Sequence, residues 1–426
     1  MEVRFFVPCT FRVSKGWHFG KFLFILKDMR KAIYLDYAAS TPVDKKVADA
    51  MMPYLRRHYG NPSSMHSFGQ KTRAAIEKAR AQAAGFLGCK ATEIIFTSGA
   101  TEANNFAIQG VIKAAIQNGK SPAPGWSVSG GKPHIVTTAI EHESVLEPCR
   151  NLEKQGITEV TYVKPQKDGV VRAEDVAAAV KENTVLVSVM YANSEIGTVQ
   201  PIAEIAKLLK PRKVLFHTDA VQAANFLECN VQKLGVDLLT LSGHKIYGPK
   251  GVGALYIRSG AGVEPLIEGG GQEMGIRSGT ENAAAIVGMG AAVESLEDPR
   301  LALTNIRIRQ LRDKLIKAVL KKIPDSELTG SLEKRLPNNA HFRFRGVEGR
   351  DLVLLLDQKG IAVSTGSACS EKTQDPSHVL LALGLSEEDA LSALRLTLGK
   401  HTKQEEVEKA VKILASAVAQ LRKSKV

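Results

Sequence analysis

The sequence lacks the features of several protein classes, and these absences narrow what the chain can be. Its cysteines are widely spaced and no two form a Cys-x-x-Cys pair, which argues against a disulfide framework and against a zinc site. The five are Cys9, Cys89, Cys149, Cys229 and Cys369. The apolar stretch "FGKFLFILK" is too short to span a bilayer, and no small-residue cleavage site follows it. We therefore predict no membrane span or secretory signal, and a reducing, cytoplasmic compartment.

The positive charge is not arranged as in a nucleic-acid-binding protein. The formal net charge is +13, but seven basic and two acidic residues in 1–31 already leave +5 there. The segment "RKSK" at residues 422–425 adds three more positive charges. No basic run is interleaved with aromatic side chains, as single-strand binding requires. We interpret the charge as a solvated surface and expect no nucleic-acid partner.

Residues 1–28 differ in composition from the rest of the chain. A start at Met29 would give "MRKAIYLDYAAS". We expect translation to begin there and residues 1–28 to be poorly ordered, with a targeting presequence as the alternative.

Short apolar segments alternate with helical patterns over the first 280 residues. Five segments rich in β-branched residues have the length of buried strands: 93–98, 134–139, 185–192, 214–219 and 236–242. A helical pattern at residues 100–119 ends on Gly119, a plausible cap. Strands that alternate with helices predict an α/β fold whose mostly parallel sheet is covered on both faces.

The remainder of the chain has a different pattern. Residues 281–320 are helical apart from a break at "DPR", and two short strands follow at residues 338–346 and 393–399. A last helix, from about Gln404 to Arg422, repeats apolar residues at steps of three and four. We therefore predict a large α/β domain followed by a smaller α+β domain.

A lysine directly follows one predicted strand, in "LSGHKIYGPKGVGALYIR" at residues 241–258. Lysine is usually a surface residue. Here, however, small residues allow a ligand to approach the backbone, and Ser242 and His244 add polar groups. In α/β proteins ligands bind where strands end. A desolvated Lys245 could form a Schiff base with an aldehyde.

An aspartate ends another predicted strand, in "VLFHTDAVQAA" at residues 214–224, and precedes Lys245 by 26 residues. A buried carboxylate costs several kcal/mol unless it is paired. Asp219 therefore either caps a following helix or faces the protonated ring nitrogen of a pyridinium cofactor.

Two more strand ends suit a phosphate and a flat ring. The segment "TSGATEANN" at 97–105 opens a helix, where backbone N–H groups bind anions. The segment "AIEHESVLEPC" places His142 in a turn, with Ser144 and Glu147 as the capping box of the next helix. A lone histidine is more often structural than functional. Together with Lys245 and Asp219, these residues describe a site for pyridoxal phosphate.

Cys369 lies in "STGSACSE" at residues 364–371, among small residues that would leave its thiol exposed. The cysteine is either incidental or a nucleophile that has to move, because thiolate is the reactive form.

Nine segments occur in the order found in cysteine desulfurases of the iron–sulfur-assembly type, a branch of the class V pyridoxal-phosphate enzymes. They are "YLDYAASTP", "GNPSSMHSFG", "FTSGATEANN", "EHESVL", "DAVQ", "SGHKIYGPKG", "GGGQEMGIRSGT", "GSACS" and "ALRLTLG". The resemblance runs from about residue 33 to the C-terminus. It implies a fold-type I pyridoxal-phosphate-dependent transferase with a seven-stranded sheet. The implied domains are 29–45 with 291–426 (small) and 46–290 (large).

The resemblance implies a role for each residue that matches a family motif. Lys245 holds pyridoxal phosphate covalently and moves protons, and Asp219 pairs with the ring nitrogen. His142 stacks on the ring and helps as acid and base, and Arg395 binds the substrate carboxylate. The other implied cofactor contacts are Gln222 to the ring hydroxyl, Ala100, Thr101, Ser242 and His244 to the phosphate, and Thr280 to the phosphate of a neighbouring subunit. The last contact implies a homodimer.

One turn departs from the family pattern of Asn-Asn before "EIG". Here "YANSEIG" has Asn193 followed by Ser194. Ser194 is too short to contact both the ring hydroxyl and the substrate carboxylate, and Asn193 points the other way if the strand continues. We expect weaker substrate binding.

The implied reaction converts L-cysteine and the thiol of Cys369 to L-alanine and a persulfide. A sulfur-acceptor protein, such as an iron–sulfur scaffold, would receive the sulfur, and tRNA thiolation is a second use. A selenocysteine lyase or an aminotransferase of the same class would share the lysine site, and a non-enzymatic binding scaffold is a further alternative. We expect no metal cofactor.

Overall fold

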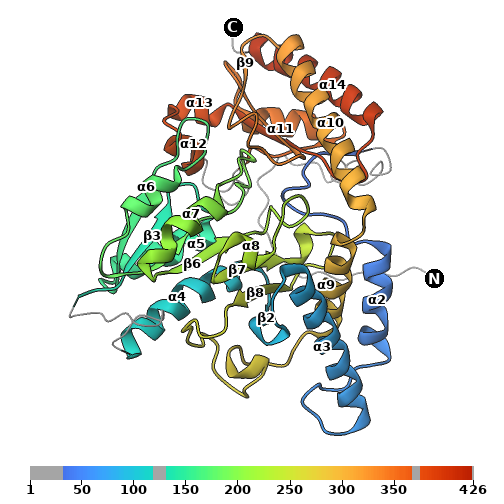
Figure 1. Cartoon of the computed structure of the whole chain (residues 1–426). Helices are drawn as coiled ribbons and strands as arrows, with labels where there is room; N and C mark the ends of the chain where they lie inside the picture. The colour runs from blue at the N-terminus through green and yellow to red at the C-terminus, as the bar shows by residue number, and fades with distance from the viewer. Residues whose placement is uncertain (1–31, 119–130, 367–374, 425–426) are drawn as a thin grey trace, which may run out of the picture.

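The computed structural model describes residues 32–118, 131–366 and 375–424, which form a larger and a smaller lobe (Figure 1). The predictions for residues 1–28, Gly119 and Cys369 concern residues outside these ranges. Within the described ranges, no helix is long and apolar enough to cross a membrane.

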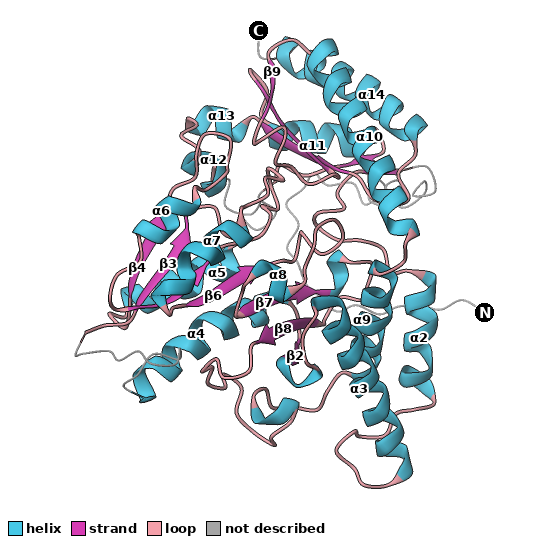
Figure 2. Cartoon of the chain, viewed as in Figure 1, coloured by secondary structure: helices cyan, strands magenta, loops and turns pink. Residues whose placement is uncertain are grey.

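The larger lobe is built on a seven-stranded, mostly parallel sheet, as predicted (Figure 2). In spatial order its strands are β2 (Ile94–Thr97), β8 (Gly253–Ile257), β7 (Leu238–Ser242), β6 (Leu215–Asp219), β5 (Thr184–Ser188), β3 (His134–Thr138) and β4 (Glu159–Val163). Strand β8 runs antiparallel to both of its neighbours. The edge strand β4 was not predicted, because its partly exposed segment "EVTYV" is not a continuous apolar run.

Alternate side chains of the buried strands enter two separate cores, one on each face of the sheet. Ile94 and Phe96 pack on one face, whereas Ile95 between them packs on the other. The helices that contribute to the first core are α2 (Lys45–Arg56), α3 (Ser67–Leu87), α6 (Ala173–Ala178), α7 (Ile202–Leu209), α8 (Val231–Leu234) and α9 (Ala283–Leu296). The second core is formed with α4 (Ala100–Asn118) and α5 (Glu143–Lys154). The predicted two-sided cover is thus confirmed.

The smaller lobe contains the predicted second sheet. Its antiparallel strands lie in the order β12 (Ala393–Thr397), β10 (Asn339–Phe344) and β9 (Ser326–Leu328). The lobe's helices are α10 (Arg300–Lys322), α11 (Gly349–Gln358), α12 (His378–Ala382), α13 (Glu387–Leu391) and α14 (Gln404–Lys423). The apolar stripe of α14 packs on this lobe's core, as predicted.

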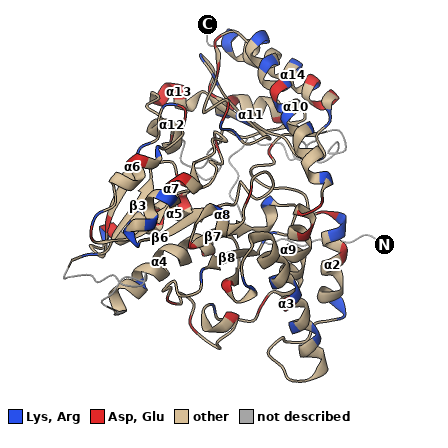
Figure 3. Ribbon diagram, viewed as in Figure 1, with Lys and Arg blue, Asp and Glu red and all other residues tan. Residues whose placement is uncertain are grey.

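The first described strand also belongs to the smaller lobe. Strand β1 (Ile33–Tyr34) pairs in parallel with β11 (Ile361–Ala362), and Leu35 is buried with the core residues of α10 and α14. The domain limits themselves stay a prediction. Along α10 basic residues predominate, with Asp313 as the acidic exception, whereas α14 begins with acidic residues and ends with basic ones (Figure 3).

Candidate active site

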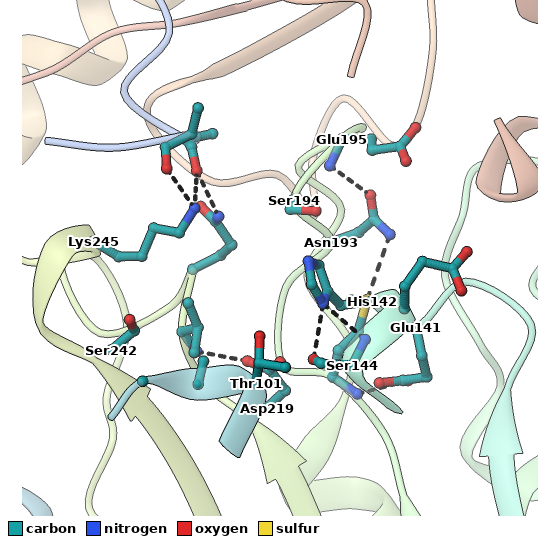
Figure 4. Close-up of a pocket in the computed structure, with 18 of the residues that line it drawn as sticks. Thr101, Glu141, His142, Ser144, Asn193, Ser194, Glu195, Asp219, Ser242 and Lys245 are labelled. Carbon is teal, nitrogen blue, oxygen red and sulfur yellow. Dashed lines mark hydrogen bonds between the residues drawn. The ribbon is translucent and has the colours of Figure 1, made fainter. Parts of the chain in front are cut away.

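A cavity of about 930 Å³ lies where the larger and smaller lobes meet, at the edge where β2, β3, β6 and β7 end. Nine of the predicted site residues line this cavity: Ala100, Thr101, His142, Asp219, Gln222, Ser242, His244, Lys245 and Arg395. Figure 4 shows Lys245 on one side of the cavity and Ser194 and His142 on the other, with Asp219 below them in this view.

Lys245 is positioned by a single turn of 3₁₀ helix, η4 (Gly243–Lys245), directly after β7. Its Nζ donates to the carbonyl oxygens of Ala38 at 2.5 Å and Ala39 at 2.8 Å. Its own carbonyl oxygen accepts from Nδ2 of Asn225. The lysine therefore connects the larger lobe to the segment that follows β1.

Asp219 is the last residue of β6 and is 7% exposed. Its Oδ2 accepts from Nδ2 of Asn104 at 2.7 Å, and its Oδ1 accepts from the backbone N–H of Val221 at 3.0 Å. Turns rather than a helix follow, so Asp219 is not a helix cap. These two donors compensate for part of the cost of burying a carboxylate.

The predicted anion-binding turn joins β2 to the N-terminus of α4. The side chain of Glu102 folds back so that its Oε2 accepts from the backbone N–H of Ser98 at 2.9 Å. Glu102 also accepts from Nε of Arg277 at 2.8 Å. Burial opposes ionisation of Glu102, but the bonds from Arg277 and Ser98 lower its pKa. A charged Glu102 therefore braces the turn that carries Ala100 and Thr101.

His142 is the N-cap of α5, because its Nδ1 accepts from the backbone N–H of Ser144. This finding corrects the predicted capping box, since Ser144 lies inside the helix and Glu147 bonds with Arg150 instead. Burial is the main reason that the pKa of His142 is lowered. The imidazole is therefore neutral near pH 7.

Arg395 lies on β12 and is 3% exposed. Its Nη2 donates to Oδ1 of Asp36 at 2.7 Å, and its Nη1 donates to the carbonyl oxygens of Ser194 and Gly366. Its Nε is buried and has no hydrogen-bond partner among the described residues. The guanidinium thus keeps a donor for a carboxylate ligand.

The departure from the family pattern falls in a turn beyond β5, not in a strand. Asn193 is buried, and its Oδ1 accepts from the backbone N–H groups of Glu195 and Ile196. Its Nδ2 donates to the carbonyl oxygen of Ile140. Because this amide holds the turn, Asn193 does not replace the missing asparagine, and Ser194 presents only a hydroxyl.

Two predicted site residues are not in the cavity of the described chain. Thr280 is exposed and does not line it, and Cys369 lies outside the described residues. The described cysteines are Cys89, Cys149 and Cys229, and burial raises the pKa of each thiol to about 12. Burial therefore disfavours the reactive thiolate form at all three positions.

Sequence reasoning missed several polar residues around the cavity. Glu141 is fully buried, and its Oε1 accepts from Thr138 and from the backbone N–H of Met190. Glu195 is also buried and accepts from Oγ of Ser377 at 2.6 Å. Glu141 lies in the segment "EHESVL". Its bond from Met190, 49 residues away, leaves no pattern in the local sequence that could have predicted it.

The chain belongs to the class-V aminotransferase family, whose model matches residues 33–410. Among its relatives, "Cysteine desulfurase IscS" from Dictyoglomus turgidum is 47% identical over 399 residues, which cover 92% of this chain and 96% of the relative. "Cysteine desulfurase IscS 1" from Archaeoglobus fulgidus is 46% identical over 389 residues, with 91% and 97% covered.

Solved structures share the fold. A "NifS-like protein" superposes with a TM-score of 0.83 at 36% identity and covers 91% of this chain and 100% of its own. The structure titled "SspA in complex with cysteine" superposes with a TM-score of 0.73 at 36% identity, with 87% and 100% covered. The predicted fold class is therefore confirmed.

Proposed function

We propose that this protein is a pyridoxal-phosphate-dependent cysteine desulfurase that converts L-cysteine to L-alanine and places the sulfur on Cys369. The observation that supports this most directly is that Lys245, Asp219, His142 and Arg395 line one cavity. These residues come from four separate segments, and relatives at 46–47% identity carry the name cysteine desulfurase.

The residues present fit pyridoxal phosphate. Asp219 brings a buried carboxylate to the cavity, as a pyridinium nitrogen requires. The N-terminus of α4 offers backbone N–H groups for the phosphate, and Lys245 offers an amine for the aldehyde. When bound, the cofactor supplies an aldehyde that captures the substrate amine and a ring that accepts electrons from the substrate α-carbon.

Different side chains of the protein would then bind the substrate, transfer protons and hold the cofactor. Arg395 orients L-cysteine through its α-carboxylate. Nζ of Lys245 takes the α-proton, and His142 exchanges a proton with the substrate. Gln222, Ala100, Thr101, Ser242 and His244 hold the cofactor, and Ser194 leaves substrate binding weaker than an asparagine would.

The sulfur step needs a thiolate from the chain. The sulfur of Cys369 bonds to the substrate sulfur, and the substrate's carbon–sulfur bond breaks. The products are L-alanine and a Cys369 persulfide, so the atoms and electrons balance with no external reductant. The persulfide then passes to an acceptor protein for iron–sulfur assembly or tRNA thiolation.

The proposal also covers the oligomeric state, the domain limits and the cellular compartment of the enzyme. Thr280 is exposed on a loop away from its own cavity, which supports a homodimer in which it reaches the partner's phosphate. We propose residues 46–290 as the large domain and 29–45 with 291–426 as the small one. The proposed compartment is the cytoplasm.

The test is to incubate purified protein with L-cysteine and assay both sulfide and alanine. The wild type should release both in the presence of a reductant. Cys369→Ala should retain the visible absorbance of the bound cofactor but lose sulfide release, whereas Lys245→Ala should lose that absorbance. Full sulfide release by Cys369→Ala would contradict the role given to that thiol.

A related class V activity is the second candidate, since a selenocysteine lyase or an aminotransferase would use the same lysine site. Offering selenocysteine and cysteine separately distinguishes them. Transamination without sulfide would exclude desulfuration, and turnover of selenocysteine alone would identify a lyase.

A further inference from the structure

The side chain of Asn104 joins two parts of the site. It is fully buried on α4, and its Nδ2 donates to Oδ2 of Asp219 at 2.7 Å and to Oγ of Ser144 at 2.8 Å. Because a carboxylate only accepts hydrogen bonds, the amide nitrogen has to face Asp219. The amide oxygen is left buried with no partner among the described residues, so this orientation is kept despite a cost.

The same contacts continue to His142. The backbone N–H of Ser144 points at its Nδ1 at 3.1 Å, which requires a lone pair on that nitrogen. Oγ of Ser144 lies 2.8 Å from the same nitrogen. Because Nδ1 carries a lone pair and no hydrogen, the hydroxyl has to be the donor in this contact, while its oxygen accepts from Asn104. Two donors therefore face Nδ1, and the ring proton lies on Nε2.

Charged groups approach His142 from every neighbouring element. They are Asp219 on β6, Lys245 on η4, Glu143 on α5 and His378 on α12. Asp219 and Glu143 favour the charged imidazolium, whereas Lys245 and His378 oppose it. These charges oppose one another, and burial is the largest reason that the ring is neutral. The hydrogen bonds at Nδ1 decide which of the two ring nitrogens carries the proton.

We propose that Asn104 and Ser144 are positioning residues: Asn104 holds Asp219 and Ser144 with one amide nitrogen, and Ser144 keeps the proton of His142 on Nε2. His142 consequently presents a protonated Nε2 to the substrate. The inference rests on the proposed function for the identity of the substrate, but the contacts among these four side chains do not depend on it.

The direct test follows the protonation of His142 in the intact, cofactor-loaded protein without cysteine. The protein is labelled with ¹⁵N-histidine, and the resonances of His142 among the ten histidines are assigned with His142→Gln. In the wild type, Nδ1 should be unprotonated and Nε2 protonated at neutral pH. In Ser144→Ala one donor to Nδ1 is lost, so the pKa of His142 should rise. Asn104→Ala should have the same effect, because the hydroxyl is then free to turn away.

Two further variants separate this role from simple packing. Ser144→Thr keeps the hydroxyl and should restore the wild-type titration. Ser295→Ala is the matched control, because that hydroxyl donates to a carbonyl of its own helix, and it should leave His142 unchanged. If Ser144→Ala alters stability but not the titration of His142, the proposal is wrong. Ser144→Ala also keeps the test valid if Asn104→Ala does not fold.

Steady-state kinetics gives an independent outcome. Ser144→Ala should lower kcat about tenfold, as loss of a residue that orients a reacting group commonly does. KM for cysteine should change less than about twofold, since Arg395 is untouched. An unchanged kcat would overturn the proposed contribution to the reaction. A shifted titration in a protein that releases no sulfide would instead refute the proposed function and leave the hydrogen-bond network standing.

Discussion

At the scale of single residues, Glu141 is an acid held in its neutral form. Its side chain is fully buried, and burial, with a smaller contribution from Asp219, raises its pKa to about 8. The folded protein therefore binds a proton that the unfolded chain has already lost above about pH 4.5. Its Oε2 has no partner among the described residues.

Glu141→Gln should consequently change how stability depends on pH. Between about pH 4.5 and pH 8 the contribution of Glu141 to the free energy of unfolding should fall as the pH rises, because the proton lost by the unfolded chain favours unfolding. The variant should lack this component, a difference on the order of a few kcal/mol. Urea unfolding at pH 5.5, 7 and 8.5 measures it. Glu147→Gln, exposed on the same helix, is the control, and parallel curves for wild type and Glu141→Gln would contradict the prediction.

The sequence revealed the residues of the site better than their contacts. Lys245, Asp219 and His142 were predictable because each lies at or just beyond the end of a strand, and parallel strands end at a common edge. The pairing of Arg395 with Asp36 was not predictable, because 359 residues separate them and neither has a local signal. The same holds for Asn104, whose place in an ordinary helical pattern says nothing of Asp219.

At the scale of elements, β8 passes very close to the anion-binding turn. A Cβ atom on Gly253 would lie 2.7 Å from the carbonyl carbon and 2.8 Å from Cα of Gly99. Both are backbone atoms, so no flexible side chain could move to make room. The absence of a side chain at Gly253 therefore sets the position of the turn.

Gly253→Ala should displace this turn and weaken cofactor retention. Gel filtration followed by absorbance at the cofactor band measures the loss, which we expect to be at least partial in one passage. Gly85→Ala is the matched control, because no atom lies within 4 Å of its added Cβ. That control should retain the cofactor and, as an alanine in a helix, gain about 1 kcal/mol. Equal retention by both variants would rule out the proposed close approach.

A buried ion pair fixes the loop that carries Thr280. Nη1 and Nη2 of Arg80 donate to the carboxylate of Glu273 at 2.6 and 2.8 Å. The same carboxylate also accepts from the backbone N–H of Phe96. Arg80→Met should cost about 3–5 kcal/mol, because it leaves a buried charge unpaired. Removing both charges in Arg80→Met/Glu273→Met should cost less. Denaturant unfolding compares them, and a double variant as unstable as the single one would refute this account.

The strands and helices were largely predictable because their apolar spacing reflects burial. The five predicted strands β2, β3, β5, β6 and β7 and the helices α4 and α14 are confirmed. The misassigned capping box shows the limit of such patterns. Ser144 and Glu147 have the right spacing, but a histidine nitrogen accepts the bond that the serine was expected to accept.

At the scale of the whole molecule, several histidines are buried in neutral form. Burial lowers the pKa of His217 and His341 to about 3, and that of His134 and His244 to about 4. In the unfolded chain these groups would titrate near 6.5. Above about pH 6.5 these histidines do not lower the free energy of unfolding. Below about pH 6.5 the unfolded chain binds protons that the folded protein excludes, and this lowers the free energy of unfolding.

The free energy of unfolding should therefore decrease steeply from about pH 6.5 toward pH 4. Each such histidine contributes up to about 1.4 kcal/mol per pH unit in this range. His217→Asn should make the decrease shallower than in the wild type when unfolding is followed by circular dichroism at pH 7, 6 and 5. An unchanged slope would show that His217 does not hold its neutral form in the folded state.

The contacts of the segment that follows β1 have a consequence for the order of events during biosynthesis. The carbonyl groups that bind Lys245 belong to Ala38 and Ala39, and the backbone N–H of Ala38 is held by Thr397, 359 residues further along. A ribosome releases the chain from its beginning, so this early segment has to wait for β12, the last strand of the described chain, before it can dock. Contacts so distant in sequence form slowly. Lys245 would accordingly acquire its final surroundings only when synthesis is nearly complete.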